Sequence, residues 1–252
     1  MYKLLSLALL LIFFNGCSSL KDTTNMTPQQ RFDYAMELYN EEDYEEAVNE
    51  FQALLLQYPG DVISDDAQFY LAMTRFKRGE YILAAYEFSK LIKNIPASEY
   101  VTDSQYFLAE SYYELSPDYN LDQRYTRKAI EEYQAFIDFF PLDDRVKDAE
   151  AKINELNNKL ARKEFQTAVI YEKMGYYTAA LIYYESVLET YHDTPFAADA
   201  LYSKIKLLIE REREQEAIAE INKFLKRYPE DSRYNEVEKL KDQIESQLSA
   251  VR

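Results

Sequence analysis

The chain has 252 residues, of which 47% are hydrophobic, and a formal net charge of -16. This is enough apolar material for one or two globular domains or for one elongated array of repeats. Only 4 glycines, 1 cysteine and 1 histidine are present, which argues against a glycine-rich nucleotide loop, an internal disulfide and cysteine- or histidine-based metal sites. The acidic balance also argues against a nucleic-acid partner, because phosphate binding depends on Lys and Arg.

The N-terminal segment has the pattern of a secretory signal peptide. Lys3 supplies a positive start, and the apolar run from Leu4 to Phe14 is broken only by Ser6. This run is well short of the ~20 residues that span a bilayer as a helix. Gly16 precedes the only cysteine, Cys17. That arrangement resembles the bacterial lipoprotein cleavage site, in which the cysteine becomes the lipid-bearing first residue of the mature chain.

Lipidation of Cys17 is favoured over an incidental cysteine for a chemical reason. A lone thiol is a liability in an oxidising compartment, whereas a thioether to a diacylglycerol uses it up. Several acyl chains, at ~0.8 kcal/mol per buried methylene, make a stable anchor. Ser18, rather than an aspartate, in the second mature position fits sorting to the outer membrane. We therefore expect a signal peptide over 1–16, a lipidated flexible tether over 17–28, and a periplasm-facing protein anchored to the outer membrane of a Gram-negative bacterium.

The remaining chain repeats one pattern five times: an alanine, a bulky residue four positions later, another three further on, and a proline five after that. The five sets are Ala47, Phe51, Leu54 and Pro59; Ala84, Phe88, Leu91 and Pro96; Ala129, Tyr133, Phe136 and Pro141; Ala180, Tyr184 and Val187 with His192 in place of proline; and Ala217, Ile221, Phe224 and Pro229. This is the second helix of a tetratricopeptide repeat, in which the alanine allows close helix crossing, the bulky residues fill the seam and the proline ends the helix.

Interruptions of the repeat predict further elements. An insertion of eight residues over Ser116–Gln123 predicts a projecting loop between two helices. Apolar residues recur at helical spacing without Pro or Gly between Val146 and Met174, which predicts one long helix joining repeats three and four. A last amphipathic stretch from Val237 to Leu248 is expected to cover the end of the array.

The predicted fold is therefore all-α, a superhelical array of about five tetratricopeptide helix-turn-helix repeats with a C-terminal capping helix. Repeats one to three occupy residues 29–141, and the long helix, repeats four and five and the capping helix occupy 142–252. In the second repeat, Asp65 or Asp66 is predicted to cap the first helix and Gly79 to form the turn.

Recognition is expected on the first helices of the N-terminal repeats. Aromatic residues at seam positions belong to the core, whereas certain first-helix residues should point into the concave groove by the geometry of the repeat. These candidates are Phe32, Met36, Tyr39, Phe69, Met73, Lys77, Tyr106 and Tyr113. Residues 17–120 hold 7 Lys and Arg against 19 Asp and Glu, and residues 121–252 hold 21 against 26. This asymmetry favours a positive partner at the N-terminal half, with binding that weakens in salt.

Solvation and helix capping explain the other polar clusters without a binding or catalytic role. The acidic run from Glu41 to Glu46 lacks the glycine and ligand spacing of a calcium loop, so we interpret it as a solvated turn. His192 lies beside Asp193, but no motif supplies a nucleophile or a metal there. The pairs at 65–66 and 143–144 lie where first helices begin, which suits helix capping. No catalytic residue, metal site or cofactor beyond the lipid is predicted.

The repeats, the lipoprotein signal and the long helix together resemble the BamD family, the lipoprotein subunit of the machine that folds β-barrels into the bacterial outer membrane. The most specific matching residues are Asp122 to Ala129, Phe136, Ile137, Pro141, Asn157 to Glu164, Ala168, Tyr171, Gly175, Tyr177, Ala179 and Ala180. The resemblance covers nearly the whole predicted mature chain.

The resemblance implies a non-catalytic scaffold. The C-terminal half would dock on periplasmic domains of the barrel-forming subunit, with Arg162, Lys163, Lys173 and Tyr176 as docking candidates. The groove of the N-terminal half would receive an extended segment of an unfolded outer-membrane protein client. Two alternatives remain open: another periplasmic tetratricopeptide lipoprotein that scaffolds cell-wall or division proteins, and a glycan-binding or hydrolytic surface lipoprotein. The second usually needs Trp platforms or paired carboxylates, and the chain has no Trp.

Overall fold

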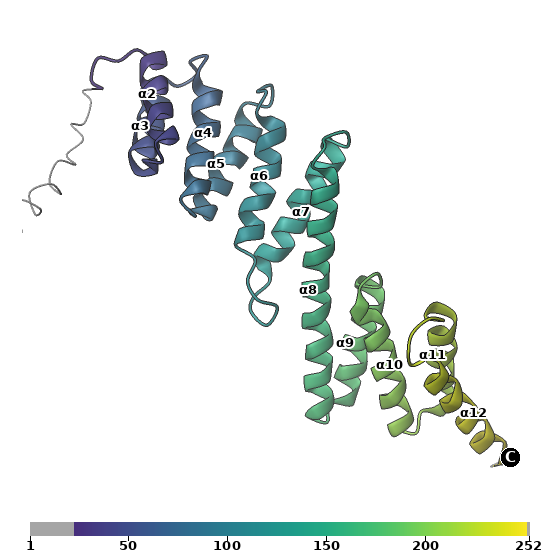
Figure 1. Ribbon diagram of the computed structural model, residues 1–252. Helices are drawn as coiled ribbons and strands as arrows, with labels where there is room; N and C mark the ends of the chain where they lie inside the picture. The colour runs from purple at the N-terminus through teal and green to yellow at the C-terminus, as the bar shows by residue number, and fades with distance from the viewer. Residues whose placement is uncertain (1–22, 251–252) are drawn as a thin grey trace, which may run out of the picture.

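The computed structural model describes residues 23–250, and within them the chain is a row of helices with no strand. The predicted signal peptide and the lipidation site Cys17 lie outside the described residues. The helices are α2 (Pro28–Asn40), α3 (Tyr44–Gln57), α4 (Ser64–Lys77), α5 (Tyr81–Asn94), α6 (Val101–Glu114), α7 (Arg124–Phe139), α8 (Val146–Lys173), α9 (Tyr177–Thr190), α10 (Pro195–Glu210), α11 (Glu214–Arg227) and α12 (Tyr234–Ala250). They stack from α2 at one end to α12 at the other (Figure 1).

The predicted superhelical array of five tetratricopeptide repeats is confirmed. The pairs α2 and α3, α4 and α5, α6 and α7, α8 and α9, and α10 and α11 are the five hairpins, and each helix packs mainly against its neighbours in the chain. All five seam alanines are fully buried, and the bulky residues four and seven positions later are 0% or 1% exposed. The seams therefore form because small residues let the helices approach while large ones fill the gap between them.

Turns inside four of the five hairpins share one backbone conformation, and the third hairpin carries the inserted loop in place of this turn. Gly79 and Gly175 have φ of 74° and 80°, and the equivalent residues of the first and fifth hairpins, Glu42 and Glu212, have φ of 63° and 56°. At each turn the amide of the following residue donates to a carbonyl five residues back, as Glu80 does to Arg75 at 2.9 Å. This closes the helix end in the manner of a Schellman motif, for which glycine is the least strained residue.

Three links between hairpins, and the link from α11 to α12, use a second shared turn, in which a side-chain oxygen two residues after the proline accepts a hydrogen bond from the amide two residues further on. The acceptors are Asp61, Ser98, Asp143 and Asp231, at 3.1, 3.2, 2.9 and 2.8 Å. The prediction that Asp65 or Asp66 caps α4 was wrong, because the N-cap position is Ile63 and makes no side-chain cap bond. Both aspartates instead accept hydrogen bonds from the next link between hairpins, where Ser98 and Tyr100 donate at 2.9 and 2.8 Å.

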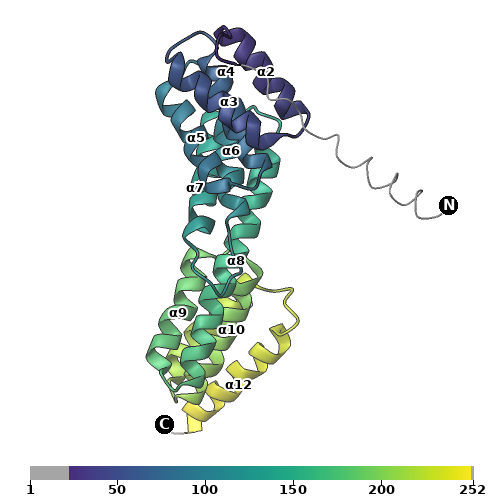
Figure 2. The same cartoon turned by 90° about the vertical axis from the view of Figure 1, so that its left-hand side faces the viewer.

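The long helix and the final helix are both present as predicted. The 28-residue α8 runs through the middle of the molecule and belongs to both halves, since it packs on α7 before pairing with α9 (Figure 2). In α12, Val237 and Ile244 are 0% and 3% exposed against α10 and α11. The last hairpin therefore ends in a helix whose outer face is polar, which stops the stack.

The last residues of the predicted tether contact the first hairpin. Thr23 Oγ1 accepts a hydrogen bond from the Arg31 guanidinium at 2.8 Å, and the Met26 carbonyl accepts one from Tyr58 at 3.2 Å. Thr27 caps α2 in a reciprocal box with Gln30. Residues just ahead of the first helix are thus held against the first hairpin. Among residues 23–250 none of the helices is long and apolar enough to cross a bilayer.

Candidate functional site

The eight predicted groove residues lie on α2, α4 and α6 and differ in exposure. Phe69 and Tyr106 are buried between helices, and Lys77 is exposed. The remaining five are partly buried: Phe32, Met36, Tyr39, Met73 and Tyr113. The surface of the first helices therefore offers mainly the edges of side chains that already pack against a neighbouring repeat.

Aromatic rings on the N-terminal first helices bridge consecutive hairpins. The Phe32 ring centroid lies 5.8 Å from that of Phe51 and 6.0 Å from that of Tyr70. Phe69 stacks on Tyr100 of the following link, with centroids 4.5 Å apart. Edge and stacked contacts of this kind contribute about 0.5–1.5 kcal/mol each beyond the area they bury. These rings accordingly set the spacing of the repeats as well as bordering the surface.

The hydroxyls of Tyr106 and Tyr113 on α6 donate hydrogen bonds to other residues of the chain. Tyr106 donates to Asp148 at 2.6 Å and Tyr113 to Glu155 at 2.8 Å, and both acceptors lie on α8. The Lys152 ammonium lies 5.7 and 5.1 Å from the two ring centroids. Burial and the accepting carboxylates raise the pKa of Tyr106 and raise that of Tyr113 to about 12. Both tyrosines are therefore neutral donors that tie repeat three to the long helix.

Two arginines, which sequence reasoning did not single out, each bind a hairpin to the start of the helix that follows it. Arg145 lies 2.8 Å from Asp103 and 2.8 Å from Asp143, and its guanidinium carbon is 4.8 Å from the Tyr106 ring and 5.5 Å from the Phe136 ring. The side chain thus joins a first helix, a seam residue and the link that leads into α8. Arg145 holds the pKa of Asp143 down, to about 2.

Arg233 makes the same constellation two repeats later. It lies 2.8 Å from Asp199 and 2.7 Å from Asp231, and its guanidinium carbon is 5.0 Å from the Tyr202 ring and 5.7 Å from the Phe224 ring. The shared sequence signal is Pro-x-Asp-x-Arg at 141–145 and 229–233, which could have been read from the repeats. We call these two groups the arginine clamps.

Arg162 and Lys163, two of the docking candidates, hold the inserted loop over residues 115–123. The Arg162 guanidinium carbon lies 4.1 Å from the Tyr119 ring centroid, and the Lys163 ammonium donates to the Leu121 carbonyl. Lys159 donates to Ser116 at 2.9 Å. The loop therefore projects from the hairpin as predicted but lies along α8, where it occupies these cations.

Lys173 and Tyr176, the other two docking candidates, lie at the turn between α8 and α9. Lys173 is exposed and Tyr176 is 58% exposed. Exposed apolar side chains surround them and form what we call the α8–α9 patch. Its members are Ile170, Met174, Tyr176 and Ile182, at 56%, 60%, 58% and 65% exposure. A hollow of about 620 Å³ lies beside them, lined in part by Tyr171 and Tyr177.

The structure does not bring the four docking candidates together. Eleven residues of one helix separate Arg162 from Lys173, which at 1.5 Å per residue is about 16 Å. Near the other end of α9, His192 Nε2 lies 3.2 Å from Asp193 Oδ2, with both side chains half or more exposed. Within residues 23–250 no group of three or more His, Cys, Asp or Glu side chains could hold a metal ion.

A family model described as an outer membrane lipoprotein, YfiO, matches residues 24–215. The chain belongs to this family. The match takes in α2 to α10, including the inserted loop, the long helix and the α8–α9 patch. Almost all of α11, and all of α12, lie beyond the matched residues.

Curated relatives support the same grouping. The chain is 27% identical to the outer membrane protein assembly factor BamD of Rickettsia prowazekii over 207 aligned residues. This alignment covers 81% of the chain and 82% of the relative. It is 30% identical over 95 residues to BamD of Caulobacter vibrioides, covering 38% of this chain and 31% of that protein. The predicted membership of the BamD family is confirmed.

Solved structures with a similar arrangement include other tetratricopeptide proteins. The TPR2AB domain of yeast Sti1 is 15% identical with a TM-score of 0.43, covering 88% of this chain and 84% of that one. A thermophilic TPR protein of Thermus thermophilus is 20% identical with a TM-score of 0.37, covering 84% and 98%.

Proposed function

We propose that this family member is a lipid-anchored, non-catalytic scaffold for the assembly of outer-membrane proteins, facing the periplasm. The observation that carries the proposal is the alignment over 207 residues with a relative named as an outer membrane protein assembly factor. The fold is compatible with it, because a stack of rigid hairpins offers long preformed surfaces to other polypeptides. Cys17 would carry the lipid that tethers this stack to the membrane.

Client segments would bind the first-helix surface of the N-terminal repeats. Met36 and Met73 occupy equivalent positions 37 residues apart, and both are partly exposed. Lys77 adds an exposed charge at the end of α4. Thioether side chains adapt to different apolar partners, which suits a surface that meets many client sequences. The buried Phe69 and Tyr106 would support this surface from beneath.

The barrel-forming subunit would dock on the α8–α9 patch. Four exposed apolar side chains flank one hairpin turn, and two of them, Tyr176 and Ile182, line one hollow, which is unusual for a surface that stays in water. Lys173 and Tyr176 would contribute a charge and an amphipathic ring at the edge of the contact. Arg162 and Lys163 would act indirectly, by holding the inserted loop against the long helix above the patch.

Depletion followed by complementation tests the proposal. Depleting the protein is expected to lower the level of barrel proteins in the outer membrane, and the wild-type gene should restore it. The double variant Met174→Asp with Tyr176→Asp should fail to restore it and should lose co-purification of a barrel protein in mild detergent. Leu142→Asp is the matched control, because Leu142 is 95% exposed and lies outside the patch.

Two outcomes would contradict the proposal. Barrel-protein levels that stay unchanged on depletion would remove the assembly role. Recovery of cell-wall hydrolases or division factors, without any barrel protein, would instead support the alternative scaffold of the cell wall or of division.

A further inference from the structure

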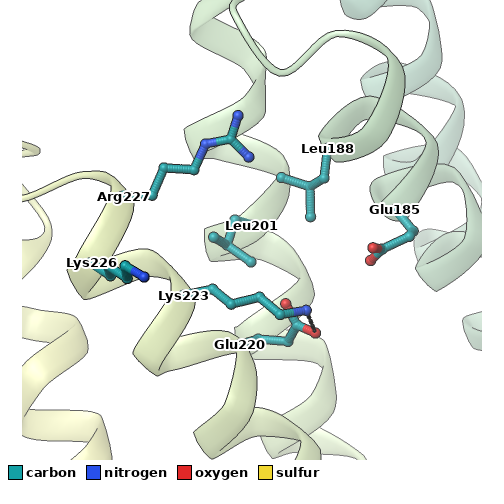
Figure 3. Close-up of a pocket in the computed structure, with 7 residues that line it drawn as sticks. All are labelled: Glu185, Leu188, Leu201, Glu220, Lys223, Lys226 and Arg227. Carbon is teal, nitrogen blue, oxygen red and sulfur yellow. Dashed lines mark hydrogen bonds and ion pairs between the residues drawn. The ribbon is translucent and has the colours of Figure 1, made fainter.

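The C-terminal hairpins carry a groove that the proposed function does not use. It lies between α9 and α11 over α10 (Figure 3) and has a volume of about 490 Å³. These helices are far from the first helices of the N-terminal repeats (Figure 1). This volume falls in the range of ~300–1,000 Å³ typical of ligand pockets. Its lining is Glu185, Leu188, Leu201, Glu220, Lys223, Lys226 and Arg227. We call it the α9–α11 groove.

The base of the groove is apolar and one wall is basic. Leu188 from α9 and Leu201 from α10 form the base, and Lys223 and Arg227 extend from α11 on either side of Leu201 (Figure 3). All three cations of the lining come from α11, in a chain whose net charge is -16. The wall is therefore a local positive surface on an acidic molecule.

The carboxylates of the groove are already matched by other lysines. Glu220 is 7% exposed and accepts Lys204 at 3.0 Å and Lys223 at 2.8 Å. Glu185 pairs with the same Lys204. These groups form an internal ion network that leaves Lys226 and Arg227 outside it.

Lys226 and Arg227 have no carboxylate partner. Among the described residues Lys226 makes no ion pair, and Arg227 donates to the His192 carbonyl at 3.4 Å, with its guanidinium carbon 5.7 Å from the ring centroid of the adjacent Tyr228. Stabilising the end of α11 does not require them, because α3, α7 and α9 end without a basic residue in the last turn. Two exposed cations beside an apolar base instead match a ligand that carries negative charge and an apolar side chain.

We propose that the α9–α11 groove binds an acidic segment of another polypeptide. A large apolar side chain of this segment fills the space over Leu188 and Leu201, and its carboxylates pair with Lys226 and Arg227. The pairing lies at the rim, so it sets the association rate and the choice of partner more than the lifetime of the complex. This interaction goes beyond the proposed function, since it uses neither the client surface nor the α8–α9 patch.

A peptide-binding experiment on the purified full-length protein in mild detergent tests this directly. The probe is the capped peptide Glu-Leu-Glu-Trp-Glu-Leu-Glu. Its tryptophan can be followed selectively because the chain contains no Trp. We expect saturable binding that weakens as salt is added. The same peptide with glutamine for every glutamate should bind far more weakly, because it keeps the apolar side chains but has no carboxylates for the basic wall.

Variants locate the site. Lys226→Glu with Arg227→Glu should weaken binding of the acidic peptide roughly tenfold or more, because two rim attractions become repulsions. Lys206→Glu with Lys239→Glu is the matched control: it makes the same change in net charge at exposed positions outside the groove and should leave affinity nearly unchanged. Circular dichroism of both doubles should match the wild type.

Three outcomes would overturn the inference. They are absence of binding by the acidic peptide, equal binding by the two peptides, and equal weakening by both double variants. Vesicles containing phosphatidylglycerol provide the remaining comparison. If they bind through Lys226 and Arg227 while the peptide does not, the basic wall recognises a lipid surface instead of a polypeptide. None of these readouts depends on outer-membrane assembly, so the two proposals can fail separately.

Discussion

At the scale of single residues, the arginine clamps concentrate several interactions in one side chain. Arg145 and Arg233 have side chains that are 30% and 24% exposed, and each joins two aspartates and two aromatic rings from the preceding hairpin and the link that follows it. Charge-assisted hydrogen bonds of this kind are worth more than exposed ion pairs because water competes for them less. The clamps should therefore matter for how firmly each hairpin is fixed to the helix that follows it.

Replacing a clamp arginine by alanine should destabilise the protein measurably. Arg233→Ala removes two carboxylate bonds and two ring contacts, so we expect a loss of about 1–3 kcal/mol in the free energy of unfolding. Arg213→Ala is the matched control, since the ion pair that it makes with Glu216 is exposed and should contribute below about 1 kcal/mol. Urea unfolding followed by circular dichroism measures both. Equal losses in the two variants would refute the clamp.

Acidity should weaken the same contacts. Arg145 lowers the pKa of Asp143 from 3.8 to about 2, and Arg233 lowers the pKa of Asp231. A carboxyl whose folded pKa is lowered stabilises the fold above its unfolded pKa and loses that contribution as the pH falls through its folded pKa. Stability should therefore drop between about pH 4 and pH 2. The double variant Asp143→Asn with Asp231→Asn should show a flatter drop in urea midpoints over this window; an identical drop would contradict the assignment.

At the scale of elements, the hairpin turns differ in strain although their geometry is shared. Gly175 and Glu212 occupy equivalent left-handed turns, at φ of 80° and 56°. A Cβ built on Gly175 meets no atom within 4 Å, so the backbone alone decides the effect of a substitution there. A side chain in this conformation costs about 1–2 kcal/mol, partly offset by the lower entropy of the unfolded chain.

The two turns should respond to substitution with opposite signs. Gly175→Ala should lower the free energy of unfolding by about 1 kcal/mol, and Glu212→Gly should raise it by about 0.5–1 kcal/mol. Denaturation midpoints of the two variants against the wild type provide the measurement. A stabilising Gly175→Ala would mean that the turn is not held in the left-handed conformation in solution.

For the long helix α8, the local sequence predicts the bounds of the helix but not its contacts with the inserted loop. Its periodic apolar residues predicted the helix over 146–174, and the structure places its end at Lys173. That Arg162 and Lys163 hold the inserted loop was not predicted, because their spacing on the helix says nothing about where residues 115–123 lie. The loop reaches them only because α6 and α7 pack beside α8.

At the scale of the whole molecule, stability should be distributed repeat by repeat. Contacts lie mostly between neighbouring helices, so damage at one end should spread little to the other. Helix α12 caps the C-terminal end of the array, because its Val237 and Ile244 are buried against the last hairpin.

Introducing a charge under α12 tests this arrangement. Val237→Asp buries a carboxylate without a partner and should cost about 3 kcal/mol or more locally. Hydrogen exchange should accelerate in α11 and α12 while amides of α2 to α5 keep their protection. Glu238→Ala, at an exposed position on the same helix, is the control. Accelerated exchange along the entire chain would show that the array unfolds as one cooperative unit instead.

Sequence reasoning succeeded where one face of one helix carries the information. The alanine seams, the turn at Gly79, the long helix and the final helix all follow from spacing and turn chemistry. It failed for Asp65 and Asp66, whose bonds go to the next link between hairpins and not to their own helix end. It also missed the arginine clamps, although Pro-x-Asp-x-Arg occurs twice.

The amino-acid pattern alone determined that this protein is a stack of helical hairpins, because small and bulky residues recur with the period that buries a seam. Its membership of the outer membrane lipoprotein family rests on the match over residues 24–215. Only the tertiary structure decided which surface side chains are free. Tyr106 and Arg162 are engaged within the chain, whereas Met174 and Lys226 are exposed. The reason is physical: the offset between neighbouring repeats sets these contacts, and no local spacing encodes that offset.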